Sequence, residues 1–133
     1  MVSRTAESTA EPLRVLLVDD NEVIGHVLVE ILRANRLEPV LASSAEDALR
    51  IASTDPPDVM VVDQGLPGLM GSDLIRIVRA SEHEALRTVP IVGLSGRADS
   101  CAALVAAGAS TFVRKPFRDL DLVAAIRAAA QRG

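Results

Sequence analysis

Five short apolar runs are the feature of this sequence that constrains its fold most. Several of the runs are rich in β-branched residues, and segments with helical periodicity separate them. The runs cover residues 14–18, 38–42, 58–62, 89–94 and 111–113. Several are continuously apolar instead of alternating, which is typical of strands covered on both faces in a parallel sheet. The sequence therefore predicts five strands that alternate with helices in a three-layer α/β sandwich with right-handed crossovers.

The intervening segments carry apolar residues at spacings of three and four, as amphipathic helices do. In the first segment this repeat consists of Val23, Ile24, Val27, Leu28, Ile31 and Leu32. Ser43 with Glu46 has the pattern of a capping box for the second helix, and Ser72 is a candidate cap for the third. Two further helices are expected around residues 101–105 and 122–126.

The chain has 133 residues, of which 49% are hydrophobic and 24% are charged, so one globular domain accounts for it. We expect this domain over residues 13–133, after a flexible N-terminal arm over residues 1–12. No stretch approaches the roughly 18 apolar residues of a membrane span, and the single cysteine can form no disulfide within the chain. These features favour a soluble, cytoplasmic protein without a membrane partner.

The charge balance argues against direct binding of nucleic acid. Lys and Arg number 14 against 18 Asp and Glu, which gives a formal net charge of −4, whereas nucleic-acid surfaces are basic. Phe112 and Phe117 are the only aromatic residues of the Phe, Tyr and Trp class, so platforms for base stacking are scarce.

Polar side chains follow four of the predicted strands. Asp19 and Asp20 come directly after the first strand, Asp63 after the third, Ser95 after the fourth, and Lys115 just past the fifth. Ligands of open parallel sheets bind beyond the carboxyl ends of the strands. We therefore expect these five side chains to converge at one edge of the sheet.

Clustered carboxylates raise one another's pKa unless a cation lies between them, and oxygen ligands suit a hard ion such as Mg2+. With the charge screened, one carboxylate can attack a phosphoryl group while Lys115 and Ser95 bind its oxygens. The residues themselves thus predict an aspartyl phosphorylation site with Mg2+ as its cofactor.

A hydrolase is the enzymatic alternative, because the sequence GLSG over residues 93–96 approaches a nucleophile elbow. That motif needs Gly at position 97, which is Arg here, and its triad needs a His after the Ser. His26 and His83 both precede Ser95. Phosphate-binding loops of the type G-x-x-x-x-G-K-[ST] are absent from the sequence as well.

Four motifs together resemble the response regulator receiver domain, the phosphoacceptor module of two-component signalling, over residues 13 to about 130. They are LLVDDNE at 16–22, VVDQGLPGLMG at 61–71, VGLSG at 92–96 and FVRKPF at 112–117. The resemblance implies a flavodoxin-like fold, in which five parallel strands in the order 2-1-3-4-5 are covered by five helices.

The resemblance also implies a role for each matched residue at the site. Asp63 is the phosphorylated residue and a metal ligand, Asp20 binds Mg2+ directly, and Asp19 binds it through water. The backbone carbonyl of Gly65 is a further metal contact.

The remaining matched residues belong to the phosphoryl site and to signal transmission. Lys115 matches the invariant lysine of the family, and the peptide bond before Pro116 is expected to be cis. Ser95 stands at the position of the Thr/Ser switch residue and Phe112 at that of the switch aromatic. Arg97 occupies a position that tunes phosphoryl lifetime in the family, as does Gly65.

The function implied is that of a phosphoacceptor signalling domain, not an enzyme, which supports its own phosphorylation and slow autodephosphorylation. The donor is a histidine kinase or a histidine phosphotransfer protein. The output is contact with a downstream protein target, through a face built from the last two helices and the fifth strand. We interpret the chain as a single-domain response regulator; a receiver excised from a hybrid histidine kinase or longer regulator, and a receiver-like domain that binds without phosphorylation, are the alternatives.

Overall fold

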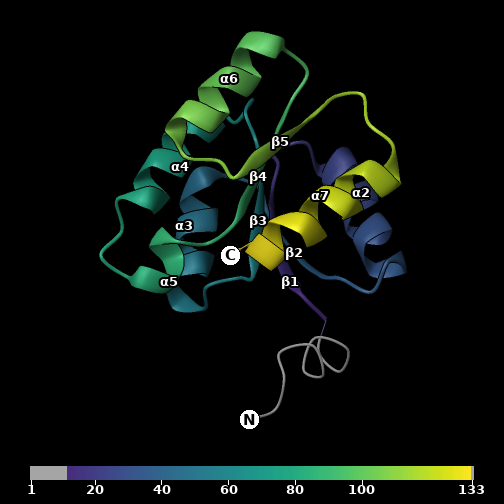
Figure 1. Cartoon of the computed structure of the whole chain (residues 1–133), viewed down its shortest axis with the longest axis horizontal. Coiled ribbons are helices and arrows are strands. Elements are labelled where there is room, and N and C mark those ends of the chain that lie inside the picture. The colour runs from purple at the N-terminus through teal and green to yellow at the C-terminus, as the bar shows by residue number, and fades with distance from the viewer. Residues whose placement is uncertain (1–11, 133) are drawn as a thin grey trace.

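Five parallel strands form one sheet in the computed structural model, which describes residues 12–132 (Figure 1). The strands are β1 (Arg14–Val18), β2 (Glu38–Ala42), β3 (Val59–Asp63), β4 (Ile91–Ser95) and β5 (Thr111–Arg114). They pair in the order β2-β1-β3-β4-β5, which confirms the predicted sheet. The predicted arm lies outside the described residues except for Pro12.

Helices cover both faces of the sheet, and Figure 1 shows α2 and α7 on the opposite side from the others. Within residues 12–132 the helices are α2 (Glu22–Ala34), α3 (Ala45–Thr54), α4 (Gly71–Arg79), α5 (Glu84–Arg87), α6 (Ala98–Ala107) and α7 (Asp119–Arg132). Five helices were predicted, and α5 was missed because four residues are too few to show a helical repeat. None of these helices is long and apolar enough to cross a membrane.

Alternate residues of the central strands supply two separate cores. Leu16 and Met60 pack with the face covered by α3, α4 and α6, whereas Leu17 and Val61 pack with α2 and α7. Every residue of β3 and β4 is buried, which explains why neither strand alternates between apolar and polar residues before its last position. Both faces of the central strands are thereby fixed, and so is the edge at which their carboxyl ends emerge.

The structure corrects two predicted helix caps. Ser44, and not Ser43, caps α3, because its hydroxyl accepts the backbone N–H three residues further on at 3.1 Å. Ser72 lies inside α4, whose N-cap is Met70. The Ser72 N–H donates instead to the side chain of Gln64 at 2.7 Å. Local spacing could not predict this cap, because its acceptor comes from the end of the preceding strand.

Arg79, the last residue of α4, binds the carbonyl groups where two other helices end. Its Nε donates to the Gly108 carbonyl at the C-cap of α6, at 2.9 Å. Its Nη1 donates to the carbonyls of Arg87 and Val89, at the end of α5, at 2.8 and 2.7 Å. Burial lowers the pKa of Arg79, but a guanidinium stays charged in proteins and suits the partial negative charge of helix C-termini.

Replacing Arg79 by methionine tests how much this contact stabilises the fold. Arg79→Met removes three hydrogen bonds from a charged donor, so we expect the free energy of unfolding to fall by about 2 kcal/mol. Arg76→Met on the same helix removes only an exposed ion pair with Asp73 and should change it by less than about 0.5 kcal/mol. Urea denaturation followed by circular dichroism measures both, and equal losses would contradict the assignment.

Candidate functional site

Polar side chains from four strands meet at the carboxyl edge of the sheet. Asp63 and Ser95 are the last residues of β3 and β4, while Asp19 directly follows β1 and Lys115 directly follows β5. The last paired residues of β1 and β3 lie side by side in the parallel register. Asp19 and Asp63 therefore emerge from adjacent strands, and the structure brings the predicted residues to one edge.

Three carboxylates form a cluster at this edge. Asp19, Asp20 and Asp63 each offer one oxygen, and these oxygens lie within 4.8 Å of one another. Asp19 and Asp63 are buried, and Asp20 is exposed. Like charges this close repel one another, and more strongly where the surroundings exclude water. Positive charge nearby relieves this repulsion.

Asp19 carries an oxygen that has no protein partner. Its Oδ1 accepts the backbone N–H of Asn21 at 2.9 Å, but its Oδ2 is buried and unpartnered among the residues that the structure describes. Burial raises the pKa of Asp19, the hydrogen bond from Asn21 opposes that rise, and the charge of Asp63 adds to it. A buried orphaned acceptor of this kind suits a cation or a water molecule bound to one.

Lys115 supplies positive charge directly to Asp63. Its Nζ donates to Asp63 Oδ1 at 2.6 Å, a short charge-assisted hydrogen bond. Because β4 lies between β3 and β5, the lysine side chain spans one strand to make this contact. The Lys115–Pro116 peptide bond is cis, as the resemblance implied.

The two residues matched to the family's switch lie on adjacent strands. The buried Ser95 hydroxyl accepts the Arg97 N–H at 3.1 Å and donates to the Arg97 carbonyl at 3.4 Å. Phe112 on β5 lies opposite Gly93 and is 43% exposed. Ser95 is thus buried at this edge with its hydroxyl bonded to the Arg97 backbone, and Phe112 lies at the surface.

Gly65 lies close to the phosphoacceptor candidate. A Cβ atom at this position would be 3.5 Å from Asp63 Oδ2, an ordinary contact distance. The Gly65 backbone is therefore near the carboxylate cluster, and its carbonyl is a candidate ligand for a cation held there.

The donor groups at this edge fit Mg2+. Carboxylates and a backbone carbonyl are hard oxygen ligands, and Mg2+ commonly uses one or two carboxylates while keeping several waters. The cluster contains neither histidine nor cysteine, which softer metals prefer. The orphaned oxygen of Asp19 can serve as the acceptor for such a water.

The sequence of the chain matches a known protein family. The family described as the response regulator receiver domain matches residues 15–127, a range that includes all the predicted site residues. The chain belongs to the response regulator receiver family. Its members are phosphoacceptor domains of two-component signalling and bind Mg2+ at an acidic pocket.

The curated relatives of this receiver domain are longer proteins. MtrA of Mycolicibacterium smegmatis (strain ATCC 700084 / mc(2)155), named a DNA-binding response regulator, is 32% identical over 121 residues. The match covers 90% of this chain and 51% of MtrA. The chain thus spans about half the length of the curated relatives it matches.

Solved structures share the fold over nearly the whole chain. A Chloroflexus aurantiacus J-10-fl protein assigned as a response regulator has a TM-score of 0.86 at 32% identity and covers 92% of this chain and 100% of its own. The receiver domain of sensor histidine kinase PA1611 from Pseudomonas aeruginosa PAO1 has a TM-score of 0.81 at 28% identity, with coverages of 90% and 98%. It was solved with a magnesium ion coordinated in its active site cleft.

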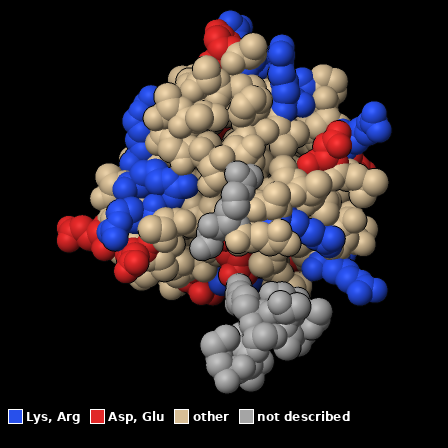
Figure 2. Space-filling view, in the orientation of Figure 1, with Lys and Arg blue, Asp and Glu red and all other residues tan. Residues whose placement is uncertain are grey.

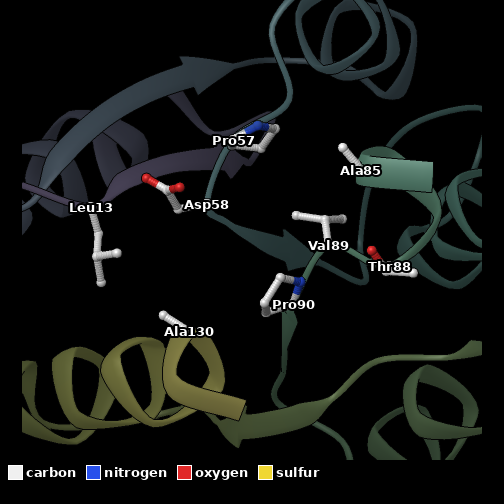
Figure 3. A pocket seen from close by; sticks show the side chains of 8 residues that line it. All are labelled: Leu13, Pro57, Asp58, Ala85, Thr88, Val89, Pro90 and Ala130. Carbon is white, nitrogen blue, oxygen red and sulfur yellow. The ribbon is translucent and has the colours of Figure 1, made fainter. Parts of the chain in front are cut away.

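A cavity of about 200 Å³ lies elsewhere on this receiver domain (Figure 3). It is lined by Leu13, Pro57, Asp58, Ala85, Thr88, Val89, Pro90 and Ala130. Several of these residues directly precede β1, β3 and β4. The cavity therefore opens at the amino edge of the sheet, opposite the carboxylate cluster, and takes no part in the acidic site.

Gln64 was not among the predicted site residues, although the structure buries it directly after Asp63. Its side chain bonds both the backbone and the hydroxyl of Ser72 in α4. The one signal of this role in the sequence is its place inside the VVDQGLPGLMG motif. Only the folded chain shows what the side chain binds.

The buried carboxylate of Asp19, with its unpartnered oxygen, has a measurable consequence for stability. In Asp19→Asn the amide oxygen can still accept the Asn21 N–H, while the buried charge is lost and the new N–H groups can donate to neighbouring carboxylates. Without metal at neutral pH, we expect the free energy of unfolding to rise by about 1 kcal/mol. The exposed Glu82→Gln, outside the helices, serves as the control and should leave it nearly unchanged.

The pH dependence of this gain follows from the raised pKa of Asp19. The native wild type binds a proton more readily there than the unfolded chain does, so this group makes the wild type less stable as pH rises through its native pKa. The advantage of Asp19→Asn should therefore fade as pH falls through the native pKa of Asp19, and should be absent below the ordinary aspartate pKa of 3.8. Urea titrations at neutral and acid pH measure this, and a variant less stable than wild type at neutral pH would contradict it.

Proposed function

We propose that this receiver domain is phosphorylated on Asp63 by a histidine kinase or a histidine phosphotransfer protein, and that the phosphoryl group alters a protein-binding face. The 2.6 Å contact of Lys115 with Asp63, beside Asp19 and Asp20, carries the proposal. A carboxylate nucleophile, a cation for phosphoryl oxygens and a candidate Mg2+ site are together at one edge.

In the proposed reaction a carboxylate oxygen of Asp63 attacks the phosphorus of a phosphohistidine in line. A P–O bond forms as the P–N bond breaks, and the histidine nitrogen keeps the electron pair and takes a proton from water. Lys115 and Ser95 bind the phosphoryl oxygens, and slow hydrolysis of the acyl phosphate ends the signal. Bound Mg2+ supplies charge screening; we assign Asp20, Asp63 and the Gly65 carbonyl to it directly and Asp19 through water.

An exposed apolar patch beside the cluster supports a protein as the donor. Val23, Ile24 and Val27 are 75%, 41% and 53% exposed, although they belong to the apolar repeat of α2. The helix begins three residues after Asp19, so the patch adjoins the carboxylates. Exposed apolar groups that cluster in this way are commonly buried by a partner.

This receiver signals through protein contact, either as a single-domain regulator or within a longer regulator or hybrid kinase. One observation favours the longer protein: the curated relative MtrA is about twice as long as the matched segment and is named DNA-binding. An immunoblot of source cells with an antibody against this domain separates the two. A longer protein gives a band well above that of a 133-residue chain.

Acetyl phosphate with Mg2+ tests the acceptor assignment. We expect intact-mass spectrometry to show one added phosphoryl group, stable in acid and labile in base, as for an acyl phosphate. Asp63→Asn should prevent it because an amide is a poor nucleophile, whereas Asp121→Asn on α7 should not. Equal uptake by Asp63→Asn would place the acceptor elsewhere, and no uptake by wild type would favour a domain that binds without phosphorylation.

We propose that Ser95 and Phe112 transmit the signal. The Ser95 carbonyl accepts the Lys115 N–H at 2.9 Å, so a shift of Ser95 also displaces the backbone at the end of β5. The phosphoryl group offers a strong, charged hydrogen-bond acceptor. The Ser95 hydroxyl gives up its contact with Arg97 and donates to a phosphoryl oxygen instead. Phe112 then turns inward, and the face of α6, β5 and α7 changes shape as a population shift. Figure 2 shows mostly uncharged side chains over α6 and β5, as suits contact with a protein.

Ser95→Ala separates acceptance of the phosphoryl group from its transmission. The variant should be phosphorylated on Asp63, since it keeps the nucleophile and Lys115, but should lose the response of the output face. We expect amide exchange at residues 97–117 to change on phosphorylation in wild type and in the control Ser100→Ala, and to stay constant in Ser95→Ala. A full response in Ser95→Ala would contradict the switch and leave the acceptor assignment intact.

A further inference from the structure

Gln64, the residue directly after Asp63, caps a helix from the end of a strand. Its Oε1 accepts the Ser72 N–H at 2.7 Å, and its Nε2 donates to the Ser72 hydroxyl at 3.3 Å. Ser72 is the second residue of α4, where the backbone N–H has no partner within the helix. The N-cap residue Met70 has only a thioether, which is a weak acceptor. Gln64 therefore supplies what the N-cap side chain cannot.

The main chain of Gln64 also closes the loop between β3 and α4. Its carbonyl accepts the N–H groups of Leu66 and Gly71, both at 3.0 Å, and its own N–H donates to the Leu94 carbonyl on β4 at 2.9 Å. Gly65 is thus the central residue of a three-residue turn. Both ends of the loop over residues 65–70 are bound by one buried residue.

Helix α4 approaches this residue without an intervening side chain. A Cβ atom at position 71 would lie 2.8 Å from Gln64 Cα and would collide with the Asp63 carbonyl oxygen. Only glycine permits this approach, so the first turn of α4 packs on the backbone of Asp63 and Gln64. The amide of Gln64 adds two side-chain hydrogen bonds to a contact in which the Gly71 N–H already donates to the Gln64 carbonyl.

We propose that Gln64 is a positioning residue for the metal site, which binds α4 to β3 and thereby holds the Gly65 backbone beside the Asp63 carboxylate. The inference rests on the proposed Mg2+ site. The Gln64 carbonyl closes the turn that contains Gly65 and also binds Gly71 at the start of α4, whereas Asp63 is held separately by its strand and by Lys115. Loss of the side-chain amide leaves α4 bound to this turn by the backbone alone, and the resulting shift of α4 should displace the carbonyl ligand more than the carboxylate. Partners that orient metal ligands commonly contribute 10- to 100-fold in affinity.

Calorimetric titration with Mg2+ of wild type, Gln64→Met and Ser44→Ala tests this role. Methionine has nearly the shape of glutamine but cannot replace its hydrogen bonds. Ser44→Ala removes a comparable cap, at 3.1 Å, from α3, which follows a strand two positions from β3. Both variants should lower the melting temperature by a few degrees. Only Gln64→Met should raise the Kd for Mg2+, by about tenfold.

The possible outcomes separate this inference from the proposed function. A melting temperature lowered with an unchanged Mg2+ Kd in Gln64→Met would make Gln64 purely structural and overturn the inference, as would an equal loss of affinity in Ser44→Ala. A wild type that neither binds Mg2+ nor takes up phosphoryl from acetyl phosphate would overturn the proposed function itself.

Amide exchange of the wild type provides a second test should Gln64→Met fail to fold. Coupling between sites is reciprocal, so bound Mg2+ should slow exchange over residues 64–73, including the Ser72 N–H that Gln64 accepts. The segment around Ser44 should exchange at the same rate with and without Mg2+. Exchange over residues 64–73 that is indifferent to bound Mg2+ would overturn the inference.

Discussion

The parallel pairing of β3 with β1 and β4 is the constraint on which the rest of this receiver domain depends. Because the strands run in one direction, their carboxyl ends and the polar residues there emerge at a single edge. The register cannot slip to relieve the crowding, since a shift of one residue would exchange the side chains of the two cores. The carboxylate cluster is thus a direct consequence of how the apolar side chains of β1, β3 and β4 pack.

Carboxylates gather at the carboxyl edge of the sheet, and a half-buried guanidinium lies at the amino edge. The carboxylates lie at the edge where α2, α4 and α6 begin, so the positive ends of helix dipoles face them. At the other edge the Arg79 guanidinium binds carbonyls where α5 and α6 end. Lys115 neutralises part of the cluster, but one oxygen of Asp19 stays buried without a partner. Functional sites commonly retain such unfavourable groups, whose effect the rest of the structure offsets.

Features that have a local pattern in the sequence could be predicted, whereas features that depend on how elements pack together could not. Buried strands appear as continuous apolar runs, and the five polar residues follow those runs within two positions, so the sheet and the place where these residues meet were predictable. Individual side-chain contacts away from that edge were not predictable. Gln64 caps α4 across the loop over residues 65–70, and Arg79 donates to the Gly108 carbonyl. Val23 is exposed, although it belongs to an apolar repeat. Each of these depends on the approach of whole elements in three dimensions.

Helix α6 is held differently at its two ends. Its C-cap, Gly108, is bound by Arg79 and adopts a φ of 122°, whereas its N-terminal end follows Arg97, whose backbone is bonded to the Ser95 hydroxyl. A helix of 10 residues is about 15 Å long, so a displacement of about 1 Å at Arg97 tilts it by about 4°. In the proposed switch, α6 would turn about its bound end at Gly108, and the displacement would be largest at the exposed side chains furthest from that end.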